Sequence, residues 1–115
     1  MKKIDMNKII ILTFIFFSSF SYSQTGEDEL YSEYKKADKE LNVAYSKLKN
    51  KLELVDKTSL INAQKAWIKF RDLNCKFMSK EDTTGGIISN KMKIDCLTQT
   101  TFERTKELKA SIEDF

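Results

Sequence analysis

Apolar residues recur every three or four positions along much of the chain, which is the periodicity of an amphipathic helix. Between about Glu27 and Val55 they fall within an arc of roughly 80° when residues are placed 100° apart. The lysines of this segment lie off that arc. The pattern predicts one long helix with an apolar stripe made of Leu30, Tyr34, Ala37, Leu41, Tyr45, Leu48, Leu52 and Val55.

The rhythm stops at residues 56–59, where Thr58 or Ser59 is the expected N-cap of a second helix. This helix is predicted from about Leu60 to Met78. Because the connection is short, the two helices are expected to form an antiparallel hairpin. The face predicted to be buried consists of Leu60, Ala63, Trp67, Phe70 and Asn74, with Gln64, Arg71 and Cys75 beside it.

A polar segment from Ser79 to about Ser89 contains Gly85-Gly86 and is expected to be a loop. A third helix is predicted from about Asn90 to Glu113. Its stripe consists of Leu97, Thr101, Arg104, Leu108, Ile112 and Phe115, with Cys96 at the edge. The fold class expected from these patterns is all-α, a small antiparallel three-helix domain.

The first residues have the layout of a cleaved signal peptide. Three lysines precede an apolar run from Ile9 to Phe20, and small residues follow at Ser21 and Ser23. The run of about 12 residues is shorter than the roughly 20 that span a bilayer as a helix. We expect a signal peptide over residues 1–23, a single domain over 24–115, export to the periplasm or the medium, and no membrane span after cleavage.

Export places the two cysteines, Cys75 and Cys96, in an oxidising compartment, where a pair in a small domain usually forms one disulfide. That bond would close a loop of about 20 residues and contribute on the order of 3 kcal/mol in the loop-entropy model. A small domain buries only a limited fraction of its surface, so such a bond is useful to it.

Charge and residue types exclude several functions. The chain has 20 basic and 17 acidic residues, and removing residues 1–23 leaves 17 and 16, so nucleic-acid binding is not expected. The chain has no histidine, so neither a Ser-His-Asp nor a Cys-His site is possible, and the cysteine spacing does not suit zinc. Its acidic clusters lie at segment ends or in the loop, where carboxylates are solvated. We expect no enzyme activity, no metal and no cofactor.

A polar set interrupts the predicted apolar faces of the second and third helices: Gln64, Trp67, Arg71 and Arg104. A buried guanidinium needs an acceptor, because an unpaired buried charge is costly. One interpretation makes the set a ligand pocket. The favoured one makes it a structural polar core, in which both arginines pair with carbonyls or carboxylates and fix how the helices meet.

These residues carry a family resemblance. Segments 37–45 (ADKELNVAY) and 63–75 (AQKAWIKFRDLNC), Gly85-Gly86, and Cys96-Leu97 with Thr101, Arg104 and Leu108 resemble the lysozyme inhibitor LprI-like N-terminal domain. The resemblance covers about Leu30 to Leu108. It implies an exported bacterial helical domain with a Cys75–Cys96 disulfide, and a protein partner that is a lysozyme-type glycosidase.

A protein inhibitor of a muramidase has to fill a substrate groove that contains two carboxylates. The candidate partner-binding segment is the loop with the cysteines at its base, formed by Lys80, Glu81, Asp82, Thr83, Thr84, Gly85 and Gly86. Two alternatives remain open. One is an envelope structural or adaptor module, and the other is an immunity protein against a peptidoglycan-cleaving toxin.

Overall fold

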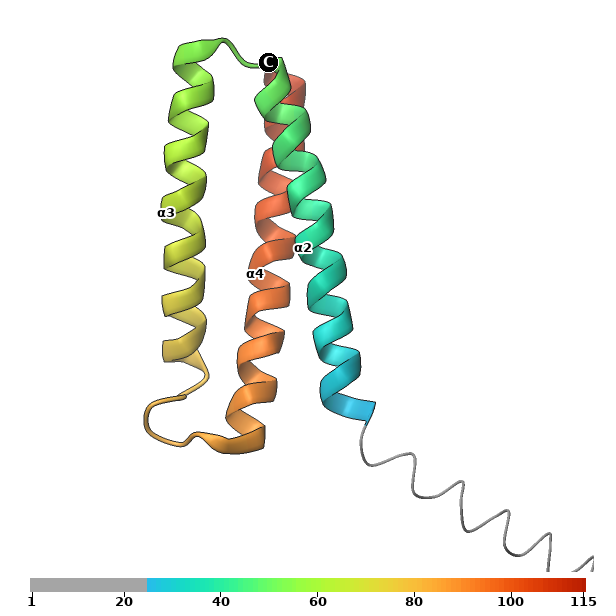
Figure 1. The fold of residues 1–115 in the computed structure, drawn as a ribbon, viewed down its shortest axis with the longest axis vertical. Helices are drawn as coiled ribbons and strands as arrows, with labels where there is room; N and C mark the ends of the chain where they lie inside the picture. Colours follow the sequence, from blue (N-terminus) through green and yellow to red (C-terminus); the bar gives the residue numbers. More distant parts are fainter. Residues whose placement is uncertain (1–24) are drawn as a thin grey trace, which may run out of the picture.

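The computed structural model describes residues 25–115, which form three helices. They are α2 (Thr25–Lys51), α3 (Leu54–Met78) and α4 (Gly86–Asp114). Figure 1 shows that α3 runs antiparallel to both other helices, so that α2 and α4 are parallel to each other. The predicted all-α three-helix domain is confirmed. The predicted signal peptide and its cleavage point lie outside the described residues.

The junction between the first two helices differs from the prediction. α2 ends at Lys51, and Glu53, with φ −69° and ψ 164°, is the N-cap of α3. Thr58 is therefore inside α3, where its hydroxyl donates to the Leu54 carbonyl oxygen at 2.9 Å. Val55 is 78% exposed, so it is not part of the core. The helical spacing continued by coincidence through a turn that contains neither glycine nor proline.

The second connection is shorter than predicted, because α4 begins at Gly86 and not near Asn90. The backbone turns at Gly85 and Gly86, which have φ values of 60° and 78°. These values lie in the left-handed region that glycine adopts without steric cost. The helix starts directly after the turn, so Ile87, Ile88 and Ser89 belong to its first turns.

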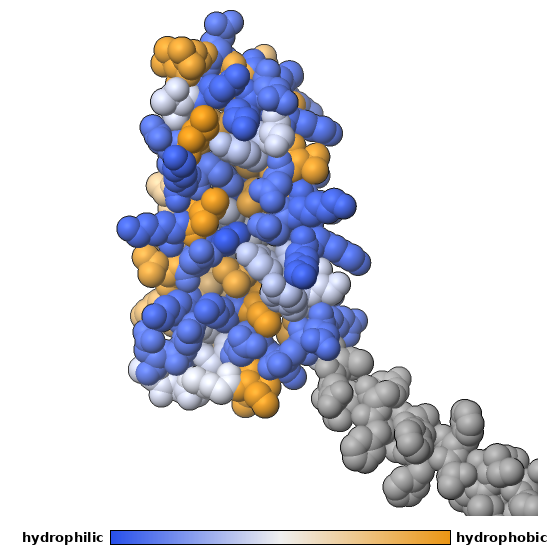
Figure 2. Space-filling view, in the orientation of Figure 1, coloured by the Kyte–Doolittle hydropathy of each residue, from blue (hydrophilic) through white to orange (hydrophobic). Residues whose placement is uncertain are grey.

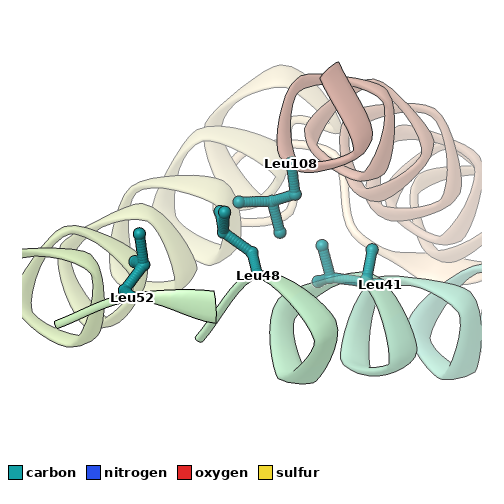
Figure 3. Close-up of a cluster of buried hydrophobic side chains, with 5 residues drawn as sticks. Leu41, Leu48, Leu52 and Leu108 are labelled. Carbon is teal, nitrogen blue, oxygen red and sulfur yellow. The ribbon is translucent and has the colours of Figure 1, made fainter. Parts of the chain in front are cut away.

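The core lies between α2 and α4. It contains Leu41, Ala44 and Leu48 of α2, Leu52 of the connection and Leu108 of α4. Leu41 and Leu48 point toward Leu108 (Figure 3). The stripe predicted on the first helix therefore supplies most of the core, although Ala44 was not predicted in it. α2 packs mainly against α4, whereas α3 contacts α4 less and α2 least.

α3 is rotated relative to the predicted orientation. Its buried residues are Gln64, Arg71 and Cys75, while Phe70 is 60% exposed. Trp67 does pack against the core cluster, as predicted, but it is only partly buried. The polar pairs and the disulfide cause this rotation, because they hold the side of α3 that carries them against the other helices.

The α4 face is also more polar than expected. Its buried residues are Ser89, Ile94, Thr101, Thr105 and Leu108, whereas Phe115 is 64% exposed and lies outside the core. The Thr105 hydroxyl donates to the Thr101 carbonyl oxygen at 3.0 Å, which satisfies it inside the helix. Within residues 25–115, no helix is long and apolar enough to cross a bilayer.

Candidate functional site

Arg71 is the centre of the polar set on α3. It is 6% exposed, and its Nε and Nη2 atoms lie 2.9 Å from the same Asp72 carboxylate oxygen. Its Nη1 atom donates to the Thr101 hydroxyl at 3.2 Å and lies 3.8 Å from the Asp38 carboxylate. One guanidinium thus bridges α3 to both α4 and α2. Its charge is compensated, which makes its burial tolerable.

Trp67 lies between two cations. The guanidinium carbons of Arg71 and Arg104 lie 5.2 Å and 5.9 Å from its ring centroid. Arg104 also donates to the Gln64 side-chain oxygen at 3.1 Å and to Glu107 at 2.9 Å. Cations at such distances over an aromatic face are attracted by its quadrupole. The set ties the three helices together, which favours the structural interpretation over a ligand pocket.

The fully buried polar atoms of this network all have partners. Among residues 25–115, no buried side-chain nitrogen or oxygen lacks a hydrogen bond. Burial raises the pKa of the Tyr34 phenol above its ordinary value, and the nearby Arg71 charge opposes part of that rise. A site awaiting a polar ligand would leave donors or acceptors unsatisfied. The network therefore leaves no buried polar atom without a partner for a ligand to satisfy.

The predicted partner-binding loop is held firmly at its base. Three successive amides, those of Thr83, Thr84 and Gly85, donate to the Lys80 carbonyl oxygen at 3.2, 2.8 and 3.4 Å. The buried Ser89 hydroxyl donates to the Ser79 carbonyl oxygen at 2.7 Å. These bonds close the loop on itself and attach it to the start of α4.

The disulfide lies directly behind this loop. Cys75 and Cys96 are bonded, with their Cα atoms 5.5 Å apart, and join α3 to α4. Cys75 is fully buried. The bond therefore restrains both helices that carry the loop, and a restrained loop loses little entropy when it binds.

The two acidic residues of the loop already have partners. Glu81 lies 2.8 Å from the Lys93 ammonium, and Asp82 lies 3.5 Å from that of Lys76. Among residues 25–115, Lys80 takes part in no ion pair. It has a φ of 57°, which is uncommon for a residue with a side chain. The free charge at the loop is thus positive.

Apolar side chains flank the loop, and sequence reasoning missed them. Met78 precedes it and is 56% exposed, while Ile87 and Ile88 follow it and are 67% and 73% exposed. A hollow of about 220 Å³ lies beside them, lined by Glu81, Gly85, Gly86, Ser89, Asn90 and Lys93. The isoleucine pair directly after two glycines was a usable signal, but the pattern alone did not show that the pair is exposed.

Metal binding has no support in this part of the chain. Residues 25–115 contain no cluster of three or more acidic, cysteine or histidine side chains placed to hold a metal ion. The acidic groups named above are instead each paired with a basic side chain. The loop and its flanks present apolar side chains and Lys80, which has no acidic partner in the described part of the chain.

Comparison with known proteins agrees with this picture. The sequence profile of the family described as lysozyme inhibitor LprI matches residues 21–108. The chain is also 32% identical over 94 residues to "Uncharacterized protein R02472" of Rhizobium meliloti (strain 1021), covering 70% of this chain and 67% of that one. No solved structure matches the chain.

Proposed function

The chain belongs to the lysozyme inhibitor LprI family, and we propose that it is an exported protein that blocks a lysozyme-type muramidase by occupying its substrate cleft. In this proposal residues 1–23 are a signal peptide, and residues 24–115 act in the periplasm or outside the cell. The protein acts by binding and not by catalysis. Mass spectrometry of exported material should find an N-terminus at Gln24 and no free thiol.

The observation that supports cleft occupation is the rigid loop end. We define the loop end as Met78, the segment 79–86, Ile87 and Ile88. Its backbone is closed by the amides bonded to Lys80, and the disulfide restrains its base. A muramidase cleft contains two carboxylates, at least one of them ionised. A lysine in the loop that is unpaired within residues 25–115, Lys80, with apolar side chains beside it, suits a groove that has an acidic floor and apolar sugar-binding walls.

This geometry indicates which loop charges can attract an enzyme. Glu81 and Asp82 are each neutralised by a lysine, so they contribute less attraction to a basic enzyme than isolated acids would. The binding free energy should come mainly from the apolar flanks, because removing apolar surface from water is the main favourable term in most protein association. Lys80 would then orient the loop toward the carboxylates of the enzyme.

A lysis assay tests the proposal. Purified protein should slow the clearing of cell-wall suspensions by at least one lysozyme class. The double variant Ile87→Ser/Ile88→Ser should lose this effect. The matched control is Leu54→Ser/Val55→Ser, which changes two residues that are each 78% exposed at the opposite end of α3 and should inhibit like the parent. Absence of inhibition against every class at micromolar excess would contradict the proposal.

A further inference from the structure

The side of α3 that faces away from the core is apolar. Phe70, Leu73 and Phe77 are 60%, 58% and 77% exposed, and their spacing of three and four residues places them on one side of the helix together with Ala66. We name these four residues the outer face of α3. Figure 2 shows apolar surface along the lower half of this helix, near the loop.

Internal contacts hold this face outward. Arg71 and Gln64 reach partners on the other helices, and Cys75 is bonded to Cys96. α3 cannot rotate to bury its phenylalanines without breaking these contacts. Scattered exposed apolar residues are normal, but several adjacent large ones mark an interaction surface.

Lysines border the outer face on one side only. With residues placed 100° apart, Lys65, Lys69 and Lys76 lie next to Leu73, whereas Ala63 and Asn74 lie on the other side. Within residues 25–115 no ion pair involves Lys65 or Lys69, and Lys76 makes only an exposed contact with Asp82. The remaining acid nearby, Asp72, is bonded to Arg71. The border is therefore a row of positive charge in which, among the described residues, Lys65 and Lys69 have no carboxylate partner and Lys76 has an exposed one.

From this arrangement we infer that the outer face of α3 binds an amphipathic helix of another protein that carries carboxylates along one edge. Apolar residues of that helix would cover Phe70, Leu73 and Phe77, and its carboxylates would pair with the lysine row. Charges beside an apolar seam determine which helix pairs with which. The outer face adjoins the loop end, since Lys76 and Phe77 line one hollow with residues 80–84. The inference is still tested independently of muramidase inhibition, because the residues that its variants change lie outside the loop end.

A second copy of the chain does not suit this face. If two copies paired through this face with their α3 helices antiparallel, the lysine row of one would lie against the lysine row of the other. If the helices were parallel, no free carboxylate of one copy would face the lysines of the other. The three side chains offer an apolar area of about 300–400 Å², whereas a stable dimer buries about 800 Å² on each partner. An anionic bilayer suits it less well, because helices that lie in a bilayer interface carry Lys and Arg on a free polar face, whereas the polar side of α3 packs against the other helices.

Synthetic helical peptides test the inference directly. The probe is a fluorescein-labelled peptide with leucines on one face and glutamates along one edge, and its control has lysines in place of the glutamates. Fluorescence anisotropy should show that the protein binds the acidic peptide and not the basic one. The affinity should fall as salt is added, because the lysine row is exposed.

Variants locate the binding. Phe70→Ser/Leu73→Ser should abolish binding, with no loss of melting temperature because both side chains are exposed. Lys65→Glu/Lys69→Glu should lower the affinity for the acidic peptide by about tenfold and allow the basic peptide to bind. Leu54→Ser/Val55→Ser is the control and should bind like the parent.

Four results would overturn the inference. They are no binding of the acidic peptide, equal binding of both peptides, binding that survives Phe70→Ser/Leu73→Ser, and a dimer in sedimentation velocity that this variant abolishes. Cosedimentation with phosphatidylglycerol vesicles in the absence of peptide binding would assign the face to membranes instead.

Discussion

Removing the disulfide is the perturbation whose effect follows most directly from the structure. The variant is Cys75→Ala with Cys96→Ala. The bond closes a loop with a sequence separation of 21 residues, and the loop-entropy model gives about 3 kcal/mol for a loop of that length. Cys75 is fully buried, so replacing its sulfur by a smaller group adds a packing loss of about 1 kcal/mol.

The free energy of unfolding should therefore fall by about 3–4 kcal/mol, a large part of the 5–15 kcal/mol typical of a domain. Urea denaturation followed by far-ultraviolet circular dichroism measures it, and the reduced parent protein is a second sample that should agree with the variant. α3 packs least against the rest of the molecule, so its contacts should be lost first. A loss below about 1 kcal/mol in both samples would refute the reasoning.

Three further predictions concern the polar network and the loop acids. Trp67→Ala should lower the free energy of unfolding by about 3 kcal/mol, because it removes packing and two cation–π contacts. Trp67→Phe should lower it less. An unchanged urea midpoint for Trp67→Ala would contradict this structural role of Trp67. Because burial raises the pKa of Tyr34 above 10.0, the folded state keeps this proton longer than the unfolded state. The free energy of unfolding should then fall as the pH rises past 10.0, and it should fall less in Tyr34→Phe. Urea midpoints measured across this pH range test the prediction, together with an alkaline titration of phenol absorbance. Glu81→Ser/Asp82→Ser should change stability by less than about 1 kcal/mol, since exposed pairs contribute little. The same variant should bind a basic lysozyme more weakly and with a flatter salt dependence; unchanged inhibition would exclude a role for these acids.

The first helix could be predicted from sequence because its buried side is apolar throughout. Leu41 and Leu48 repeat at helical spacing, and nothing polar competes for the same side. The second helix could not be oriented in this way. Its buried side carries Gln64 and Arg71, whose burial depends on Thr101, Asp38 and Arg104, all distant in sequence. An analysis of hydrophobic periodicity treats polar residues as exposed. It therefore assigned Phe70 to the buried side of the second helix.

In the loop, too, only some features could be predicted from the sequence. Gly85 and Gly86 indicated a turn, and the structure has one there. The pairing of Glu81 with Lys93 and of Asp82 with Lys76 depends on how α3 and α4 meet, which local sequence does not encode. The exposure of Ile87 and Ile88 could not be predicted either. It depends on where α4 begins, because a helix that starts directly after the glycines determines which side chains face solvent.

The proposed inhibition depends on the loop end occupying a muramidase cleft. Inhibition kinetics with a soluble chitin oligosaccharide as substrate test it most directly, since the oligosaccharide binds in that same cleft. We expect competitive inhibition: the protein raises KM without changing kcat, and Ile87→Ser/Ile88→Ser abolishes the effect while Leu54→Ser/Val55→Ser does not. A lowered kcat with unchanged KM, or inhibition that the loop-end variant retains, would contradict it.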